Sequence, residues 1–326
     1  MDSAEFGFKL RQELREELDD LHDGFDGEPV VDSYGRYGDF ALVGHGKQTN
    51  EKCGRFSRFF GCVRGDLHDH VDLDGVNHRG KAYVKAVFHS CDKPSCPLCF
   101  DAWARRECRK IEGRLVEASK RFGLVEHIVA SVPLKDYGLS FEDLRRNTVK
   151  ILYSRGVVGG VLIFHGFRYN RVKQWYFNPH FHVLGFVLGG YGCRGCKKVC
   201  FKGCGGFEDK TRRCFESDGY IVKVLDKRIT VGGTAYYQLN HSTVKVNAKR
   251  FHVATWFGIA SYRKLKVTVE RRKPLCPICG SELVPLLYFG DGRLDFSKVG
   301  SFDDLVDKDG RSLWVEDTRV SVWNRE

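Results

Sequence analysis

The order of apolar and polar residues predicts a series of strands in the middle of the chain. Short apolar runs, or alternating apolar and polar residues bounded by glycine or proline, are typical of strands. Such patterns cover residues 81–88, 125–133, 157–169, 179–190, 219–225 and 250–261. Apolar residues at helical spacing cover residues 1–20, 101–123, 140–156 and 230–242. Ser140 is a suitable N-cap, and Gly123 and Gly156 are suitable helix ends.

The order strand, helix, strand, strand with short connections predicts the fold class. It is typical of an α+β fold in which a central antiparallel sheet carries helices on one face. We expect an acidic N-terminal arm over 1–52, a zinc knuckle and basic helix over 53–124, the sheet domain over 125–270 with a cysteine-rich insertion over 191–214, and a second zinc knuckle with an acidic C-terminal tail over 271–326.

Composition and charge indicate the class of partner and the cellular compartment. The 326 residues are 42% hydrophobic and 29% charged, which is ordinary for a globular protein. Lysine and arginine outnumber the acidic residues by 53 to 42, giving a net charge of +11, so a polyanion such as nucleic acid is the natural partner. The N-terminus has no apolar leader, and no stretch approaches the roughly 20 apolar residues of a membrane span. We therefore expect an intracellular, cytoplasmic protein with no membrane partner.

The 13 cysteines favour metal binding over disulfides, because their number is odd and their spacing is that of zinc ligands. Three CxxC pairs place two thiolates on a tight turn, the geometry of half a tetrahedral zinc site. We expect a first site of Cys91, Cys96 and Cys99, with Cys62 or Cys53 as the fourth ligand and His89 as a weaker candidate. A second site would use Cys193 and Cys196 with Cys200 and Cys204, or with Cys214 replacing one of them. In a third, Cys276 and Cys279 would take upstream ligands from the insertion or from Cys53. The alternative is free buried thiols or a redox pair, and Cys108 is expected to be only a buried thiol.

The strand over 179–190 contains two histidines, His180 and His182, whose spacing puts both imidazoles on one face. There they can reach one divalent ion, while Phe181 and Val183 on the reverse face enter a core. His165, on the preceding strand, is a candidate third ligand. The alternatives are two surface histidines and a packed His165.

The helix over 230–242 contributes two tyrosines. Ala235, Tyr236 and Leu239 share a side expected to be packed, while Tyr237 and His241, four residues apart, share another. A tyrosine in this position, beside an ion, is a candidate nucleophile. Basic and aromatic residues nearby suit a groove that follows a single-stranded backbone and stacks on its bases: Arg168, Tyr169, Arg171, Lys173, Trp175 and Tyr176.

Together these features resemble the HUH endonuclease superfamily, in which U is a hydrophobic residue, here Phe181. The segments PHFHVLGF, AYYQLNHS, ATWFGIASYRKL and DKPSCPLC are similar to the rolling-circle replication initiators (Rep proteins) of small archaeal plasmids and viruses. The resemblance covers roughly Cys53 to Leu283. The family's first motif would fall on Ile128 to Pro133, where the usual threonines are absent and Ser131 is nearest.

The resemblance implies site-specific nicking and joining of single-stranded DNA through a 5′-phosphotyrosine on Tyr237, or alternatively on Tyr236. It implies Mg²⁺ or Mn²⁺ at His180 and His182, although imidazoles alone favour a later transition metal. Where many members have a lysine after the tyrosine, this chain has His241.

The partners would be origin DNA, a host polymerase and a host helicase, because the chain has no GxxxxGK[ST] motif. Two alternatives remain: a related HUH transposase, and a non-catalytic zinc-ribbon DNA-binding protein. In either reading the thiolate-bound Zn²⁺ would be structural.

Overall fold

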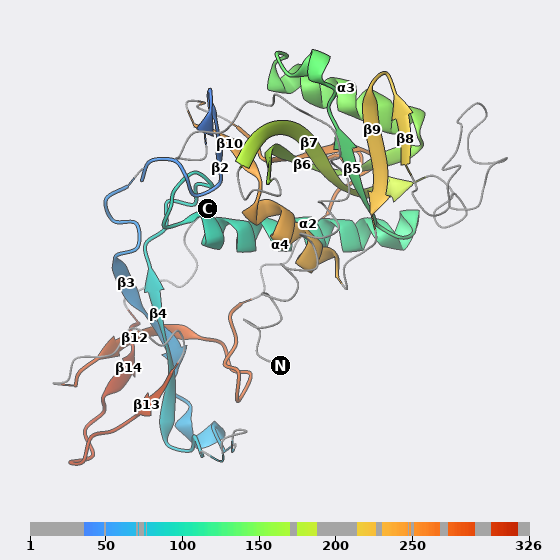
Figure 1. Cartoon of the computed structure of the whole chain (residues 1–326). Helices are drawn as coiled ribbons and strands as arrows, with labels where there is room; N and C mark the ends of the chain where they lie inside the picture. The colour runs from blue at the N-terminus through green and yellow to red at the C-terminus, as the bar shows by residue number, and fades with distance from the viewer. Residues whose placement is uncertain are drawn as a thin grey trace. The chain divides into compact units, whose positions relative to one another are not determined.

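The chain consists of two compact units, described from a computed structural model (Figure 1). The described residues are 36–48, 50–69, 71, 75, 77–169, 175–187, 214–225, 230–246, 248, 251–267, 273–290 and 301–318. Unit 1 comprises Met1–Gln48 and Asp92–Val269, and unit 2 comprises Thr49–Cys91 and Glu270–Glu326. The contacts therefore divide the chain differently from the predicted boundaries at 52 and 124, because the basic helix belongs with the sheet domain. The predicted N-terminal helix over 1–20 lies outside the described residues.

Unit 1 is built on an antiparallel six-stranded sheet in the order β11-β6-β7-β5-β9-β8. Its strands are β5 (Glu126–Ser131), β6 (Val157–Tyr169), β7 (Trp175–Val187), β8 (Cys214–Ser217), β9 (Tyr220–Leu225) and β11 (Ala254–Gly258). A small sheet of β1 (Arg36–Tyr37), β2 (Phe40–Leu42) and β10 (Thr243–Lys245) lies beside it in the same unit. The predicted α+β class with an antiparallel sheet is confirmed.

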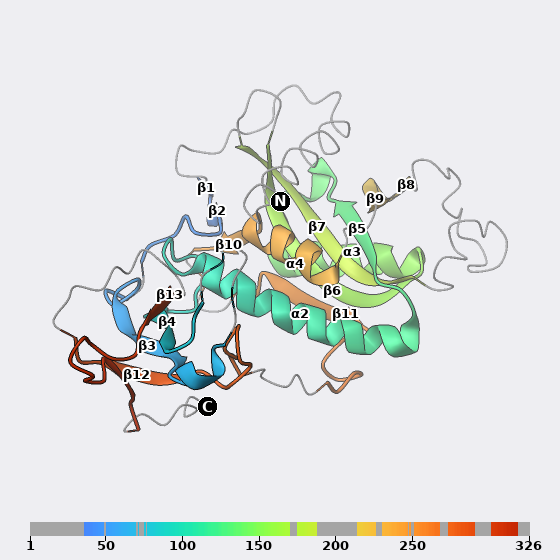
Figure 2. The ribbon, with the colours of Figure 1, turned by 90° about the horizontal axis from the view of Figure 1, so that it is seen from below.

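Helices cover both faces of this sheet, so the prediction of helices on one face is wrong. Helix α3 (Phe141–Ser154) packs on the face that carries Phe164 and Phe181. Helices α2 (Phe100–Phe122) and α4 (Val231–Asn240) pack on the opposite face. Figure 1 shows α3 on one side of the sheet and α2 with α4 on the other, and Figure 2 shows α2 and α4 lying across their face. The central strands are apolar on both faces, so each face requires a cover.

The helix ends are as the sequence predicts. The Ser140 hydroxyl accepts a hydrogen bond from the Asp143 backbone N–H, which caps α3. Gly123 ends α2 with a φ of 86°, a conformation that a residue with a Cβ rarely adopts. In the described part of the chain, no helix combines the length and the apolar character that crossing a bilayer requires.

Unit 2 contains a five-stranded antiparallel sheet in the order β13-β4-β3-β12-β14. Its elements are β3 (Phe56–Cys62), a 3₁₀ turn (Gly65–Leu67), β4 (Lys81–Phe88), β12 (Val284–Tyr288), β13 (Ser301–Asp304) and β14 (Trp314–Glu316). Trp314 from the last strand packs on Ala82, Val84 and Leu286. The C-terminal region that looked like an acidic tail thus contributes two strands to this sheet.

Candidate functional site

Three buried histidines form a cluster on the α2 and α4 face of the unit 1 sheet. His165 on β6 is directly opposite His180 on β7, and His182 follows two residues later on the same face. One ring nitrogen of each histidine lies within 4.8 Å of the others. Relative exposure is 4% for His165 and 3% for each of the other two, which rules out the alternative of two surface histidines. On the reverse face, Phe181 and Val183 enter the core as predicted.

A bulge in β7 prepares the position of His180. His165 pairs with His180 and Phe167 pairs with Phe177, so β7 has one residue more than β6 over this interval. Pro179 lies in the bulge, where its missing N–H costs no ladder hydrogen bond. The carbonyl of Asn178 is thereby directed back at the His180 ring, 2.7 Å from Nδ1. The sequence Asn-Pro before the first histidine thus fixes that ring locally.

Each ring is held through its Nδ1 atom. His180 donates from Nδ1 to the Asn178 carbonyl, and Nδ1 of His182 lies 3.0 Å from Nε2 of His127. His165 hydrogen-bonds to the backbone carbonyl of Gln238, while its Nε2 is buried and has no hydrogen-bond partner among the described residues. Anchoring at one ring nitrogen and an open second nitrogen is the arrangement of metal-binding histidines. The residues present therefore fit a metal ion.

Burial keeps two of the imidazoles neutral. It lowers the pKa of His165 to about 3, with a further lowering from nearby His241. Burial also lowers the pKa of His182 well below its ordinary value, and the neighbouring histidines act in the same direction. Neutral rings have the lone pairs that metal ligation needs. No carboxylate belongs to the cluster in the described part of the chain. The three-histidine cluster could hold a metal such as zinc.

Helix α4 runs beside the cluster and presents its two tyrosines differently. Ala235 and Leu239 are buried against the α2 side, as the pattern predicts, and Tyr236 packs with them. The Tyr236 hydroxyl donates to the Asp101 carboxylate, and burial followed by this hydrogen bond raises the pKa of Tyr236. The Tyr237 ring instead lies 4.6 Å from the His241 ring, centroid to centroid. The charge of His241 lowers the pKa of His165, so His241 acts on the cluster electrostatically.

The predicted DNA-binding residues are placed only in part. Arg168, on β6, is buried and donates from Nη2 to the Ser131 hydroxyl at 2.8 Å. Its charge lowers the pKa values of both His165 and His182, so it lies near the cluster. Trp175 packs against Tyr169, with ring centroids 5.1 Å apart. Arg171 and Lys173 lie outside the described residues.

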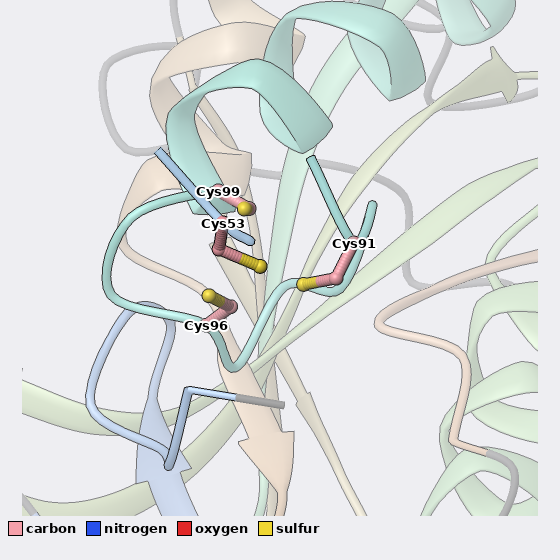
Figure 3. Close-up of side chains that lie close together, drawn as sticks. All are labelled: Cys53, Cys91, Cys96 and Cys99. Atoms are coloured by element: carbon pink, nitrogen blue, oxygen red, sulfur yellow. The ribbon is translucent and has the colours of Figure 1, made fainter. Parts of the chain in front are cut away.

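A first thiolate cluster unites Cys53, Cys91, Cys96 and Cys99. Their sulfur atoms lie within 4.8 Å of one another. Figure 3 shows the four side chains gathered beside the start of α2. Cys96 and Cys99 lie on the turn that leads into α2, where the Cys99 and Phe100 N–H groups bond to the Cys96 carbonyl. Of the three candidates for the fourth ligand, Cys53 joins the group, whereas Cys62 and His89 do not. Four cysteines in this arrangement could hold zinc.

A second group, Cys62, His68, Cys276 and Cys279, lies within unit 2. The two further donors lie upstream of Cys276, and they are Cys62 and His68. The predicted Cys53 is wrong, because Cys53 lies in the first group. The insertion cysteines from Cys193 to Cys204 lie outside the described residues, so that alternative stays a prediction. His68 donates from Nδ1 to the Lys81 carbonyl at 2.8 Å, which leaves Nε2 facing Cys276 Sγ at 3.3 Å. Gly280, with a φ of 70°, closes the knuckle turn after Cys279.

The thiols of this second group differ in acidity. Burial raises the pKa of Cys62 to about 12. Burial also opposes ionisation of Cys279, but hydrogen bonds from Ser281 outweigh it and lower the pKa of Cys279 to about 6. The sulfurs of Cys62 and Cys279 lie 3.6 Å apart, at hydrogen-bond distance, and form no disulfide. Three thiols and one imidazole form a closed donor set of the kind that binds structural zinc.

The remaining cysteines add little to these groups. Cys193, Cys196, Cys200 and Cys204 lie outside the described residues, and Cys214 is described only as backbone in β8. Cys108 is a buried thiol, as predicted, and donates to the Gly232 carbonyl.

Sequence reasoning missed three residues: His68, His127 and Gln238. His127 begins an alternation with Val129 and Ser131 that places it on the cluster face, and this pattern was a usable signal. The other two carry no such signal, because their partners are distant in sequence. Comparisons of the chain with models of known protein families, with curated proteins and with solved structures found no match.

Proposed function

We propose that this protein nicks and rejoins single-stranded DNA through a covalent link to Tyr237, and initiates rolling-circle replication of a plasmid or virus. The observation that carries the proposal is the cluster of His165, His180 and His182, in which an orphaned Nε2 lies beside the helix bearing Tyr237. The sequence resemblance to HUH replication initiators supplies the reaction class. We propose Mg²⁺ or Mn²⁺ as the ion held by these three residues.

The charge of the site favours a phosphodiester. The three imidazoles are the cluster's only ligand groups in the described part of the chain, and the Arg168 guanidinium adds a buried positive charge nearby. A bound divalent ion would supply further positive charge against the scissile phosphate. An anionic ligand is therefore the natural complement, and a DNA phosphate meets that requirement.

In the proposed reaction, the Tyr237 hydroxyl oxygen attacks phosphorus as the bond from phosphorus to the 3′ oxygen breaks. The phenol loses its proton, the 3′ oxygen gains one, and the products are a 5′-phosphotyrosine and a 3′-hydroxyl. His241 donates from Nδ1 to the Tyr237 carbonyl at 3.0 Å, so in the neutral form of the ring the lone pair is on Nε2. His241 is thus suited to hold the phenol proton. Attack by the 3′-hydroxyl reverses the step and rejoins the strand.

Tyr237 is the better nucleophile of the two tyrosines. Tyr236 would have to give up its hydrogen bond to Asp101 and its contact beneath the Arg105 guanidinium, 5.3 Å from the ring centroid. Its raised pKa also disfavours the phenolate. Tyr237 instead lies beside His241, whose charge lowers the pKa of His165.

The test is adduct formation with a random pool of single-stranded oligonucleotides and Mn²⁺. Wild type should form a detergent-stable protein–DNA adduct, and the captured strands should share a sequence. Tyr237→Phe should abolish the adduct, whereas Tyr236→Phe, the matched control, should retain it. His180→Ala should remove the adduct while leaving zinc content unchanged.

An adduct lost only in Tyr236→Phe would overturn the tyrosine assignment. Sequence-specific DNA binding without any adduct in Mg²⁺, Mn²⁺, Co²⁺ or Zn²⁺ would refute the enzyme and favour the zinc-ribbon alternative.

A further inference from the structure

We propose that His127 is a positioning residue for the metal centre: its Nε2 accepts a hydrogen bond from Nδ1 of His182 and so holds Nε2 of His182 toward the cluster. The inference rests on the proposed function in one respect, that the three-histidine cluster binds a divalent ion. It assigns the role to a residue on β5 that contributes no ligand atom to the cluster.

The geometry of the pair is that of a direct hydrogen bond between two buried rings. Nε2 of His127 and Nδ1 of His182 are 3.0 Å apart, and the rings are stacked with centroids 5.2 Å apart at 27°. His182 pairs with Val129 across β5 and β7, so His127 is its diagonal neighbour on the same face. Both side chains are almost fully buried. Solvent therefore cannot replace this contact cheaply if it is lost.

Counting protons selects one arrangement of the pair. Two nitrogens at hydrogen-bond distance share a single proton, so one ring donates and the other accepts. If His127 donated, neutral His182 would carry its proton on Nε2 and could not bind a metal through that atom. If His182 donates from Nδ1, the lone pair on its Nε2 is available for a metal ion. Metal binding through Nε2 thus requires that His127 be the acceptor.

Gln238 favours the same arrangement from the other side. Its amide nitrogen lies 3.5 Å from Nε2 of His127, so two donors face one acceptor nitrogen. The backbone carbonyl of Gln238 also accepts the hydrogen bond from His165. Gln238 of α4 therefore contacts both His165 and His127, the hydrogen-bond partner of His182. Because Tyr237 precedes it in the helix, the same contacts hold the candidate nucleophile in register with the metal ligands.

The test measures Mn²⁺ affinity of zinc-loaded, full-length protein by the electron paramagnetic resonance signal of free Mn²⁺. His127→Leu keeps the volume of the side chain but removes the acceptor, and should weaken binding about 10- to 100-fold. His127→Gln restores an acceptor oxygen near the Nε2 position, and should bind within about threefold of wild type. Val129→Ala is the matched control: it removes packing next to His182 without touching the hydrogen bond, so it should lower the melting temperature and leave Mn²⁺ affinity unchanged.

A spectroscopic measurement reads the same arrangement directly. Nitrogen-15 spectra of histidine-labelled, Mn²⁺-free protein at neutral pH should show both His127 and His182 with the proton on Nδ1. A proton on Nε2 of His182, or equal Mn²⁺ affinities for wild type and His127→Leu, would overturn the inference. Equal weakening in His127→Leu and His127→Gln would also overturn it, since packing alone would then explain the loss. If His180→Ala binds Mn²⁺ as tightly as wild type, the cluster is not the metal site and the proposed function fails instead.

Discussion

Acid should destabilise the metal-free protein because His165 is buried as a neutral base. An unfolded histidine titrates near 6.5, whereas burial lowers the pKa of His165 to about 3 in the folded state. Between these values the unfolded chain binds a proton that the native protein does not bind. The contribution of His165 to stability is therefore constant above pH 6.5 and falls as the pH falls toward 3. The perturbation is acidification of wild type and of His165→Leu, which lacks the titrating group.

The magnitude follows from the two pKa values. Each pH unit below 6.5 should cost about 1.4 kcal/mol, so acidification to pH 5 should cost wild type about 2 kcal/mol more than His165→Leu. This is a substantial part of the 5–15 kcal/mol that typically stabilises a folded domain. The pKa of His182 is lowered in the same direction, so both proteins should also lose stability through that residue. The variant should lose less, because His165 contributes to the lowering of the His182 pKa.

Amide hydrogen exchange over β6 and β7 is the suitable assay, because it reports the opening free energy of unit 1 separately from unit 2. Rates measured from pH 7 to pH 5 are corrected for the intrinsic pH dependence of exchange. Zinc is retained and Mn²⁺ omitted, so effects on the thiolate groups cancel in the difference. Parallel profiles for wild type and His165→Leu, within about 0.5 kcal/mol, would refute the argument that His165 is held neutral.

In a separate experiment at pH 7, Mn²⁺ at 100 times its Kd should stabilise wild type by about 2.7 kcal/mol and leave the stability of His165→Leu unchanged.

Two further predictions concern stability away from the histidine cluster. His68→Leu should lower the zinc content, measured by elemental analysis, by one ion per chain, because His68 completes a closed donor set. It should also open the unit 2 strands to amide hydrogen exchange. His89→Ala, outside that set, should retain full zinc, and equal zinc in both variants would exclude His68 as a ligand. Arg114→Met should destabilise unit 1 by about 3 kcal/mol in urea unfolding, since the buried guanidinium donates to the Ala260 and Leu265 carbonyls. Arg109→Met, at an exposed position of the same helix, should change stability by less than about 0.5 kcal/mol. A similar loss in both variants would contradict a stabilising role for the two buried hydrogen bonds of Arg114.

The strands and helices of unit 1 could be predicted because their signals are local. Alternation, capping by Ser140 and the glycine at 123 depend on residues close in sequence, and the elements form where these signals lie. The prediction failed on which faces the helices cover. Phe164 and Ile163 are both apolar, so the sequence of β6 indicates burial on two faces but does not say which helix covers each face. The division into units was equally non-local, because unit 2 joins segments from both ends of the chain.

Local spacing establishes which side chains of the candidate site share a face. His180 and His182 are two residues apart on a strand, and Tyr237 and His241 are four residues apart on a helix, so strand and helix periodicity place each pair together. Their partners depend on how the elements pack. The bulge at Pro179, the pairing of β6 with β7 and the packing of α4 bring His165, His127 and Gln238 to these residues. Likewise, CxxC spacing identified half of each thiolate group, while strand pairing and loop packing selected Cys53 for one and His68 for the other. Ligands contributed by distant segments depend on long-range packing, which has no counterpart in local periodicity.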